Sequence, residues 1–186
     1  MKNRTKIIKL IVGLITVILC SFPTFAQESG KVKTLLRELR SVDDPEVASV
    51  ERELLFIWSK TGSPSADLIL TRANSDFAQN KFEAAANRFA TVTEMAPDHA
   101  GAHLGQARAL FQLGYIGPAI VRFERALELD PDFYPALFSL AQVYERLDRD
   151  ELAFKTYEAV YEIHPRLSGL DEALQRLSAS VKGQSL

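Results

Sequence analysis

Residues 66–167 divide into three segments of equal length, which read ADLILTRANSDFAQNKFEAAANRFATVTEMAPDH, AGAHLGQARALFQLGYIGPAIVRFERALELDPDF and YPALFSLAQVYERLDRDELAFKTYEAVYEIHPRL. Four columns recur every 34 residues in one phase: an early small residue, a later small residue, a ring and a proline. The members are Ala73, Ala107 and Ala141; Ala85, Ala119 and Ala153; Phe89, Phe123 and Tyr157; and Pro97, Pro131 and Pro165. A fixed period of this length is typical of a solenoid, in which each repeat contacts its neighbours.

Each column has a physical reason in a pair of antiparallel helices. Helices pack about 8–10 Å apart, and the closer distances need small side chains at the contact, which the alanine columns supply. Between the two expected helices of each segment lies a further repeated position, held by Asn80, Gly114 and Asp148. Glycine favours the left-handed conformation that ends a helix, and asparagine and aspartate tolerate it. The pattern therefore predicts two helices per segment, joined by a sharp turn.

This pattern resembles the tetratricopeptide repeat (TPR), which has small residues in both helices, an aromatic residue in the second helix and a closing proline. The resemblance implies an all-α solenoid, a right-handed superhelix of antiparallel helix pairs with capping helices at both ends. The three repeats are expected at 66–99, 100–133 and 134–167. Repeats one and two depart from the family pattern, because Arg72, His103 and Gln106 stand where large apolar residues are usual.

The segments that flank the repeats are expected to cover the open ends of the solenoid. Residues 27–65 form the predicted N-terminal helical cap, which we expect to cover the open apolar face of repeat one. Within it, residues 27–30 are a short polar lead, and helices are predicted at about 31–40 and 45–59 from the spacing of apolar residues. The stretch FIWSKTGSPSADLIL, residues 56–70, is similar to a group of small exported bacterial TPR proteins.

The C-terminal flank, residues 168–186, is predicted to be a capping helix with a loose tail. Leu170, Leu174 and Leu177 recur there at helical spacing, and Gly183 can end the helix.

The first 26 residues have the features of a secretory signal peptide. Four basic residues among the first nine precede an uncharged and mostly apolar stretch at 10–22. This stretch is shorter than the roughly 20 residues that a spanning helix needs, and the small residues Thr24 and Ala26 suit cleavage after Ala26. Cleavage predicts an exported, periplasmic protein without membrane insertion. The alternative is an uncleaved N-terminus that anchors the chain in the inner membrane.

Removal of residues 1–26 would also change the composition of the chain. Its one cysteine, Cys20, lies in this segment, and Val17-Ile18-Leu19 lacks the small residue that a lipidation site needs beside its cysteine. The segment carries four of the 22 basic residues and none of the 24 acidic ones, so the remaining chain has a formal net charge of −6. This balance argues against nucleic-acid binding, which depends on clustered lysine and arginine.

Candidate catalytic and metal sites are weak. His99 and His103 are four residues apart, a spacing that can chelate a metal on a helix. A zinc site needs at least three protein ligands, and no third ligand lies in phase, so we interpret them as surface or inter-repeat residues and expect no metal and no cofactor. The sequence contains no Gly-rich phosphate loop, nucleophile elbow or Cys/His pair. We therefore expect that the protein is not an enzyme.

The TPR resemblance implies that the first helix of each repeat lines a concave groove that binds a partner. The expected lining residues are Leu70, Asn74, Phe77, Leu104, Arg108, Phe111, Phe138, Gln142 and Arg146. Rings provide contact area, and amide side chains can pair with the backbone of a bound peptide. The alternative for Phe77, Phe111 and Phe138 is ordinary packing between repeats. TPR domains that capture acidic C-terminal tails carry lysine where Leu70 stands, which argues against such a tail as the partner.

The sequence therefore predicts an exported TPR adaptor that binds another envelope protein or a peptide in its groove. One alternative is a structural subunit of an envelope assembly, joined through its convex face or its ends. The other is a membrane-tethered cofactor of an envelope enzyme complex. An apolar patch outside the groove would favour the first alternative, and an uncleaved N-terminus would favour the second.

Overall fold

The computed structural model describes residues 23–41 and 44–183, and all the regular secondary structure of these residues is helical. In chain order the helices are α2 (Pro23–Ser41), α3 (Asp44–Trp58), α4 (Pro64–Ala78), α5 (Phe82–Met95), α6 (Ala100–Gln112), α7 (Ile116–Leu129), α8 (Tyr134–Arg146), α9 (Asp150–Ile163) and α10 (Leu170–Gly183). Within the described ranges, no helix combines the length and the hydropathy that crossing a membrane requires.

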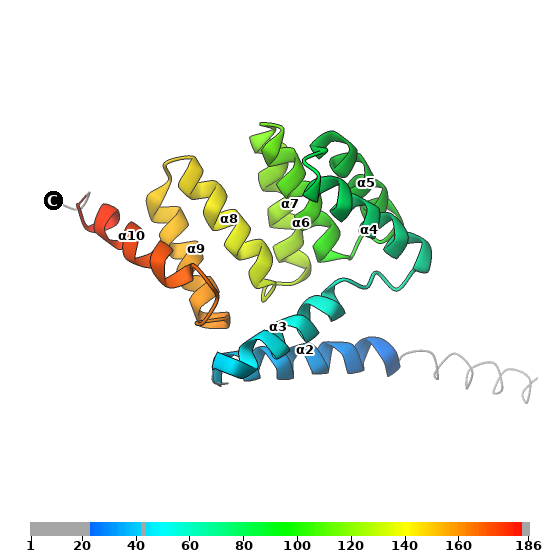
Figure 1. Cartoon of the computed structure of the whole chain (residues 1–186), viewed down its shortest axis with the longest axis horizontal. Helices are drawn as coiled ribbons and strands as arrows, with labels where there is room; N and C mark the ends of the chain where they lie inside the picture. Colours follow the sequence, from blue (N-terminus) through cyan, green and yellow to red (C-terminus); the bar gives the residue numbers. More distant parts are fainter. Residues whose placement is uncertain (1–22, 42–43, 184–186) are drawn as a thin grey trace, which may run out of the picture.

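The three repeats are the helix pairs α4–α5, α6–α7 and α8–α9, which stand in a row from right to left in Figure 1. The turn inside each pair adopts the predicted left-handed conformation, with φ values of 59° at Asn80, 81° at Gly114 and 55° at Asp148. All six alanines of the two small-residue columns are 0% exposed, and the three rings of the aromatic column are 1% exposed. The two alanine columns and the ring column therefore lie in the core of an α-solenoid, as predicted, whereas the prolines lie outside it.

Repeats one and two pack without room for an added methyl group at Gly105. A Cβ atom there would lie 2.2 Å from the ring of Phe89, which projects from α5. The family departures on the same helix are also buried, because His103 is 4% exposed and Gln106 is 8% exposed. His103 Nε2 donates to the Pro97 carbonyl oxygen at 2.9 Å, so this polar residue is integrated into the junction between repeats.

The N-terminal helix pair differs from the prediction in two respects. First, α2 begins at Pro23, so the predicted polar lead at 27–30 is helical. Second, α2 and α3 do not cover repeat one, where Leu68 on α4 remains 54% exposed. They run instead beneath the repeats in Figure 1, across the edge where the connections between repeats lie. This edge matches the apolar side of the pair. The core cluster there joins Leu35, Leu36, Leu39, Val47, Val50 and Leu54 to Tyr134, Tyr157, Val160, Ile163 and Leu170.

Two polar contacts with aromatic neighbours explain why the pair lies at this edge. Trp58 Nε1 donates to Asp130 Oδ2 at 3.0 Å, and the indole meets the ring of Phe133 edge-on with centroids 4.9 Å apart. Further along the edge, His164 Nε2 lies 2.7 Å from Glu51 Oε1. Burial raises the pKa of the Asp130 carboxyl, and the hydrogen bond from Trp58 opposes this shift. The core clusters that include residues of the pair take their other members from repeats two and three and from α10.

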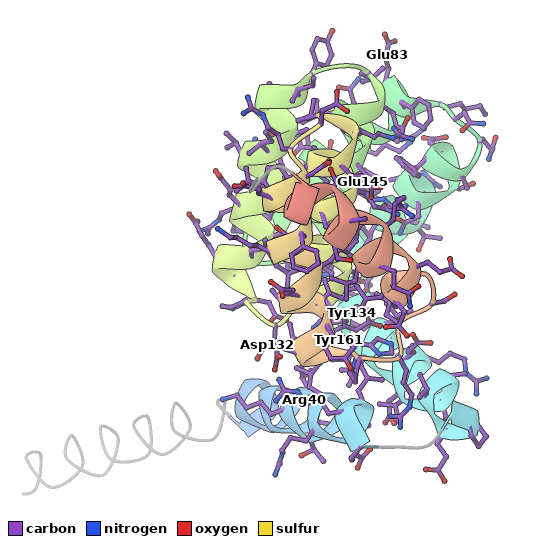
Figure 2. All side chains as sticks on the ribbon, turned by 90° about the vertical axis from the view of Figure 1, so that its left-hand side faces the viewer. Arg40, Glu83, Asp132, Tyr134, Glu145 and Tyr161 are labelled. Atoms are coloured by element: carbon purple, nitrogen blue, oxygen red, sulfur yellow. The ribbon has the colours of Figure 1, made fainter. Side chains whose placement is uncertain are left out.

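At the other end of the solenoid, α10 packs against α9. Its residues Leu170, Ala173 and Leu177 are at most 3% exposed and join the same core cluster as α2 and α3. Figure 2 views the molecule from this end, with α10 in front of the repeats and α2 across the bottom.

Candidate functional site

A hollow of about 450 Å³ lies on the side of the solenoid formed by the first helices of the repeats. We call this hollow the groove. Its lining comes from α4, α6, α7 and α8, and consists of Phe77, Arg108, Phe111, Gln112, Phe123, Ser139, Gln142, Val143, Glu145 and Arg146. The groove therefore spans all three repeats, and rings and charged groups alternate along it.

Two arginines of the groove stack on phenyl rings of the preceding repeat. The Arg108 guanidinium carbon lies 4.9 Å from the centroid of the Phe77 ring, and that of Arg146 lies 5.5 Å from the centroid of Phe111. Both distances fall within the roughly 6 Å over which a cation is attracted to a ring face. Desolvation lowers the pKa of Arg108, but an arginine side chain stays charged in proteins. The stacks therefore hold two positive charges in fixed places.

Glu145, the acidic residue of the lining, is engaged by two neighbours. Its Oε1 atom accepts from Arg176 Nε at 2.9 Å and from Arg176 Nη2 at 2.5 Å, and its Oε2 atom accepts from the Tyr157 hydroxyl at 3.1 Å. Burial raises the pKa of Tyr157, and the Glu145 charge adds to this, so the hydroxyl keeps its proton and donates. Figure 2 labels Glu145 on α8, close behind the ribbon of α10. The C-terminal helix thus reaches the groove through one side chain.

The structure brings five of the nine predicted lining residues together in the groove: Phe77, Arg108, Phe111, Gln142 and Arg146. Asn74 is exposed on α4, outside the hollow.

The remaining three predicted residues are packing residues, which corrects the expected lining. Leu70 and Leu104 are 5% and 7% exposed and belong to the core clusters, because their side of the helix faces the neighbouring helices of the solenoid. Phe138 packs edge-on against Tyr157, with ring centroids 5.5 Å apart. All three rings are half-buried, but only Phe77 and Phe111 line the hollow, so the packing alternative fits Phe138.

The groove lining includes residues that were not predicted from the sequence: Gln112, Phe123, Ser139 and Val143. Nor was Arg176 predicted, which lies outside the lining and holds Glu145. Ser139 and Val143 lie one helical turn from Gln142 or Arg146 on α8, so helical spacing around the predicted residues could have found them. Arg176 had no such signal, because its contact with Glu145 depends on how α10 packs in three dimensions.

The two histidines considered as metal ligands make local contacts. His99 Nδ1 accepts from the Ala102 N–H at 2.9 Å and so caps the start of α6. Desolvation lowers the pKa values of both His99 and His103. Across residues 23–41 and 44–183, no cluster of three or more His, Cys, Asp or Glu side chains could hold a metal ion.

Comparison with known families and proteins agrees with the repeat architecture. Three family models described as tetratricopeptide repeat match residues 70–115, 100–133 and 123–155. A TPR repeat-containing protein of Rhizobium etli is 23% identical over 154 residues, which cover 82% of this chain and 76% of that protein.

Solved TPR domains share the fold. The first TPR domain of Spaghetti (RPAP3) bound to the HSP90 peptide SRMEEVD matches with a TM-score of 0.59 and 22% identity, over 63% of this chain and 93% of that chain. The TPR2B-domain:pHsp70 complex of yeast Sti1 matches with a TM-score of 0.58 and 22% identity, over 63% and 99% of the two chains. The Sgt2 TPR domain from Aspergillus fumigatus matches with a TM-score of 0.61 and 18% identity, over 66% and 83%.

Proposed function

This chain belongs to the tetratricopeptide repeat family, and from that premise we propose that it is an exported adaptor that binds a segment of another envelope protein in its groove. The observation that carries the proposal is the pair of Arg–Phe stacks, Arg108 on Phe77 and Arg146 on Phe111, that line one hollow. TPR domains of the same fold are bound to peptides in solved complexes, which supports a peptide or protein partner here.

The chemistry of the lining suits a polypeptide better than a small polar metabolite. Half-buried rings at Phe77 and Phe111 leave apolar area for a side chain of the partner to cover. Gln142 is exposed one repeat after Arg108, and its amide can both donate to and accept from a peptide backbone. Buried aromatic and arginine side chains are also the residues in which binding free energy concentrates at protein interfaces. The groove therefore offers both area and polar pairing along its length.

The adaptor proposal is supported by the peptide-bound TPR domains of the same fold. The acidic residue of the groove lining, Glu145, is engaged by Arg176 and Tyr157.

Export is the second part of the proposal, and the features of residues 1–26 support it. Cleavage after Ala26 would shorten α2 by its first four residues, Pro23–Ala26. The leucines at 35, 36 and 39 that join α2 to the core would remain, so the mature chain keeps the contacts of its N-terminal helix pair.

Site-specific photocrosslinking in the native host tests the groove. A benzoylphenylalanine at Gln142, an exposed residue of the groove, should capture a specific partner. The matched control is the same amino acid at Glu124, an exposed residue of α7 outside the groove lining. Capture of a partner from Glu124 and not from Gln142 would refute the groove proposal.

A second hollow, of about 580 Å³, favours the alternative of a structural subunit that is joined through one end of the solenoid. It lies between α9 and α10 and includes Phe154, Tyr161 and Leu174 in its lining. Tyr161 is 46% exposed there, so an apolar surface exists at the C-terminal end of the solenoid. A structural subunit joined through this end would crosslink from Tyr161 and not from Gln142, which separates the two functions.

A further inference from the structure

The charges that line the groove restrict which charge a bound partner segment can carry. Three charged side chains reach the hollow: Arg108, Arg146 and Glu145. The two guanidinium carbons lie over the rings of Phe77 and Phe111, at 4.9 Å and 5.5 Å from the ring centroids. A guanidinium has five N–H donors in a planar fork, and this fork matches a carboxylate through two parallel hydrogen bonds. Among the described residues, neither arginine has a carboxylate within ion-pair distance.

Glu145 is the lining residue that could cancel part of this positive charge, and Arg176 prevents it from doing so. Two N–H groups of Arg176 point at one carboxylate oxygen of Glu145, and the Tyr157 hydroxyl donates to the other. The Glu145 side chain is 26% exposed, whereas that of Arg176 is 58% exposed on α10. Both carboxylate oxygens are thus occupied before a partner arrives, and the Arg176 charge compensates that of Glu145.

The remaining charge of the groove is then positive, although the full chain carries a formal net charge of −2. A hollow with low-dielectric walls concentrates the field of the charges that line it. Basic segments would be repelled by Arg108 and Arg146, whereas acidic side chains would find two unpaired guanidinium edges beside apolar rings. Charge complementarity therefore selects one class of partner.

We propose that the groove recognises an internal acidic segment, in which Asp or Glu alternates with apolar residues, and that Arg176 sets this preference by holding Glu145. This inference rests on the proposed function of the groove. Arg176 acts as a positioning residue, because it works through Glu145 rather than by contact with the partner. The TPR resemblance implies a lysine at the position of Leu70 in domains that bind a chain terminus. Leu70 is apolar and buried in the core, so an internal segment is favoured over a chain terminus.

Selection from a random-peptide phage library against the full chain tests the inference. The parent protein should enrich peptides rich in Asp and Glu. Arg176→Gln should lose this enrichment and bind a selected acidic peptide about tenfold more weakly, equal to about 1.4 kcal/mol. Lys155→Gln removes the same charge from an exposed position on α9 and should behave like the parent.

A rescue variant separates the charge effect from loss of structure. In Arg176→Gln with Glu145→Gln, no carboxylate remains to be held, so the preference for acidic peptides should return. If the parent enriches neutral or basic peptides, or if the Arg176→Gln variant keeps the acidic preference, the inference is overturned while the groove remains a binding site. If no protein in the set enriches any peptide, the proposed function itself is overturned. Failure of the double variant to regain the preference would show that Arg176 is structural, and would also overturn its proposed role.

Discussion

Gly105 shows at the scale of one residue how the repeats come together. Its missing side chain is the space that the Phe89 ring occupies, since an added Cβ atom would lie 2.2 Å from that ring. Phe89 is 1% exposed and cannot swing out into solvent. The sequence showed Phe89 as part of a repeated column, but Gly105 has no counterpart in the period, so its role could not be predicted. The contact between Gly105 and Phe89 depends on how α5 and α6 pack, and the repeat period carries no information on it.

We predict that Gly105→Ala destabilises the protein by about 1–3 kcal/mol through overpacking. Gly117→Ala is the matched control, because nothing lies within 4 Å of a Cβ atom at this helical position. That control should stay within about 1 kcal/mol of the parent, in the stabilising direction expected from helix propensity. Urea unfolding of both variants measures the difference. Equal free energies of unfolding for the two variants would contradict the packing seen between α5 and α6.

His103 gives a second prediction at this scale, on pH. Desolvation lowers its pKa below the ordinary value of 6.5, and the charges of Arg122 and Arg125 add to this, against an opposing hydrogen bond to Pro97. The unfolded chain therefore takes up a proton at a higher pH than the folded chain does. Stability is unaffected by this group above about pH 6.5 and falls as the pH decreases below it.

Thermal melts at about pH 7.5 and about pH 5.5 bracket this transition. Between these two pH values, the melting temperature should decrease more in the parent than in His103→Gln. The glutamine keeps a polar side chain but cannot titrate. The pKa of His99 is also lowered, so part of the pH dependence of stability should remain in the His103→Gln variant. An identical loss in both proteins would show that His103 does not titrate differently in the two states.

At the scale of helices, the repeats were predictable and the N-terminal pair was only partly so. The turns at Asn80, Gly114 and Asp148 depend on local backbone chemistry that recurs in the sequence. In α2 and α3, the apolar spacing around Leu39 and Leu54 indicated that one side is buried, but spacing carries no information on the surface that buries it. The edge of repeats two and three competes with the face of repeat one, and its aromatic and polar partners decide the outcome.

Trp58 is the one tryptophan of the chain, so its fluorescence reports where the N-terminal pair lies. We predict that Phe133→Leu shifts the emission of Trp58 to longer wavelength, because the ring 4.9 Å from the indole is lost and water gains access. Phe77→Leu, a matched change on α4 of repeat one, should leave the emission unchanged. A shift caused by Phe77→Leu and not by Phe133→Leu would place the pair on repeat one instead.

For the whole molecule, the sequence indicated the side of the solenoid on which the hollow lies more reliably than it indicated the residues that line it. The period placed Arg108 and Gln142 one repeat apart on the first helices, and both reach the groove. It could not separate Leu104 from them, because one residue of helical rotation decides between the core and the hollow. Arg176 lies outside the repeats altogether and enters the site through the packing of α10.

Export is a prediction for the whole chain. The basic head, the apolar stretch at 10–22 and the small residue Ala26 favour cleavage by signal peptidase. Intact-mass measurement of protein from the cell envelope should give a chain that begins at Gln27. A mass that includes residues 1–26 would contradict cleavage and leave the membrane-anchored alternative.

Binding of the partner in the groove is tested by Arg108→Ala combined with Arg146→Ala, two changes outside the core. Exposed charges contribute little to stability, usually under about 1 kcal/mol, so the melting temperature should hardly change. Phe111→Ala should differ by losing both binding and stability, because this ring packs against the core cluster of repeat two as well as lining the groove.

Calorimetric titration of each variant with the partner captured from Gln142 provides the direct measurement. Arg122→Ala with Arg125→Ala removes the same charge from α7, outside the groove lining, and is the matched control. We predict that the groove variant binds at least about tenfold more weakly than the parent, equal to about 1.4 kcal/mol, while the control binds as the parent does. Parent-like affinity in the groove variant would contradict binding of the partner in the groove.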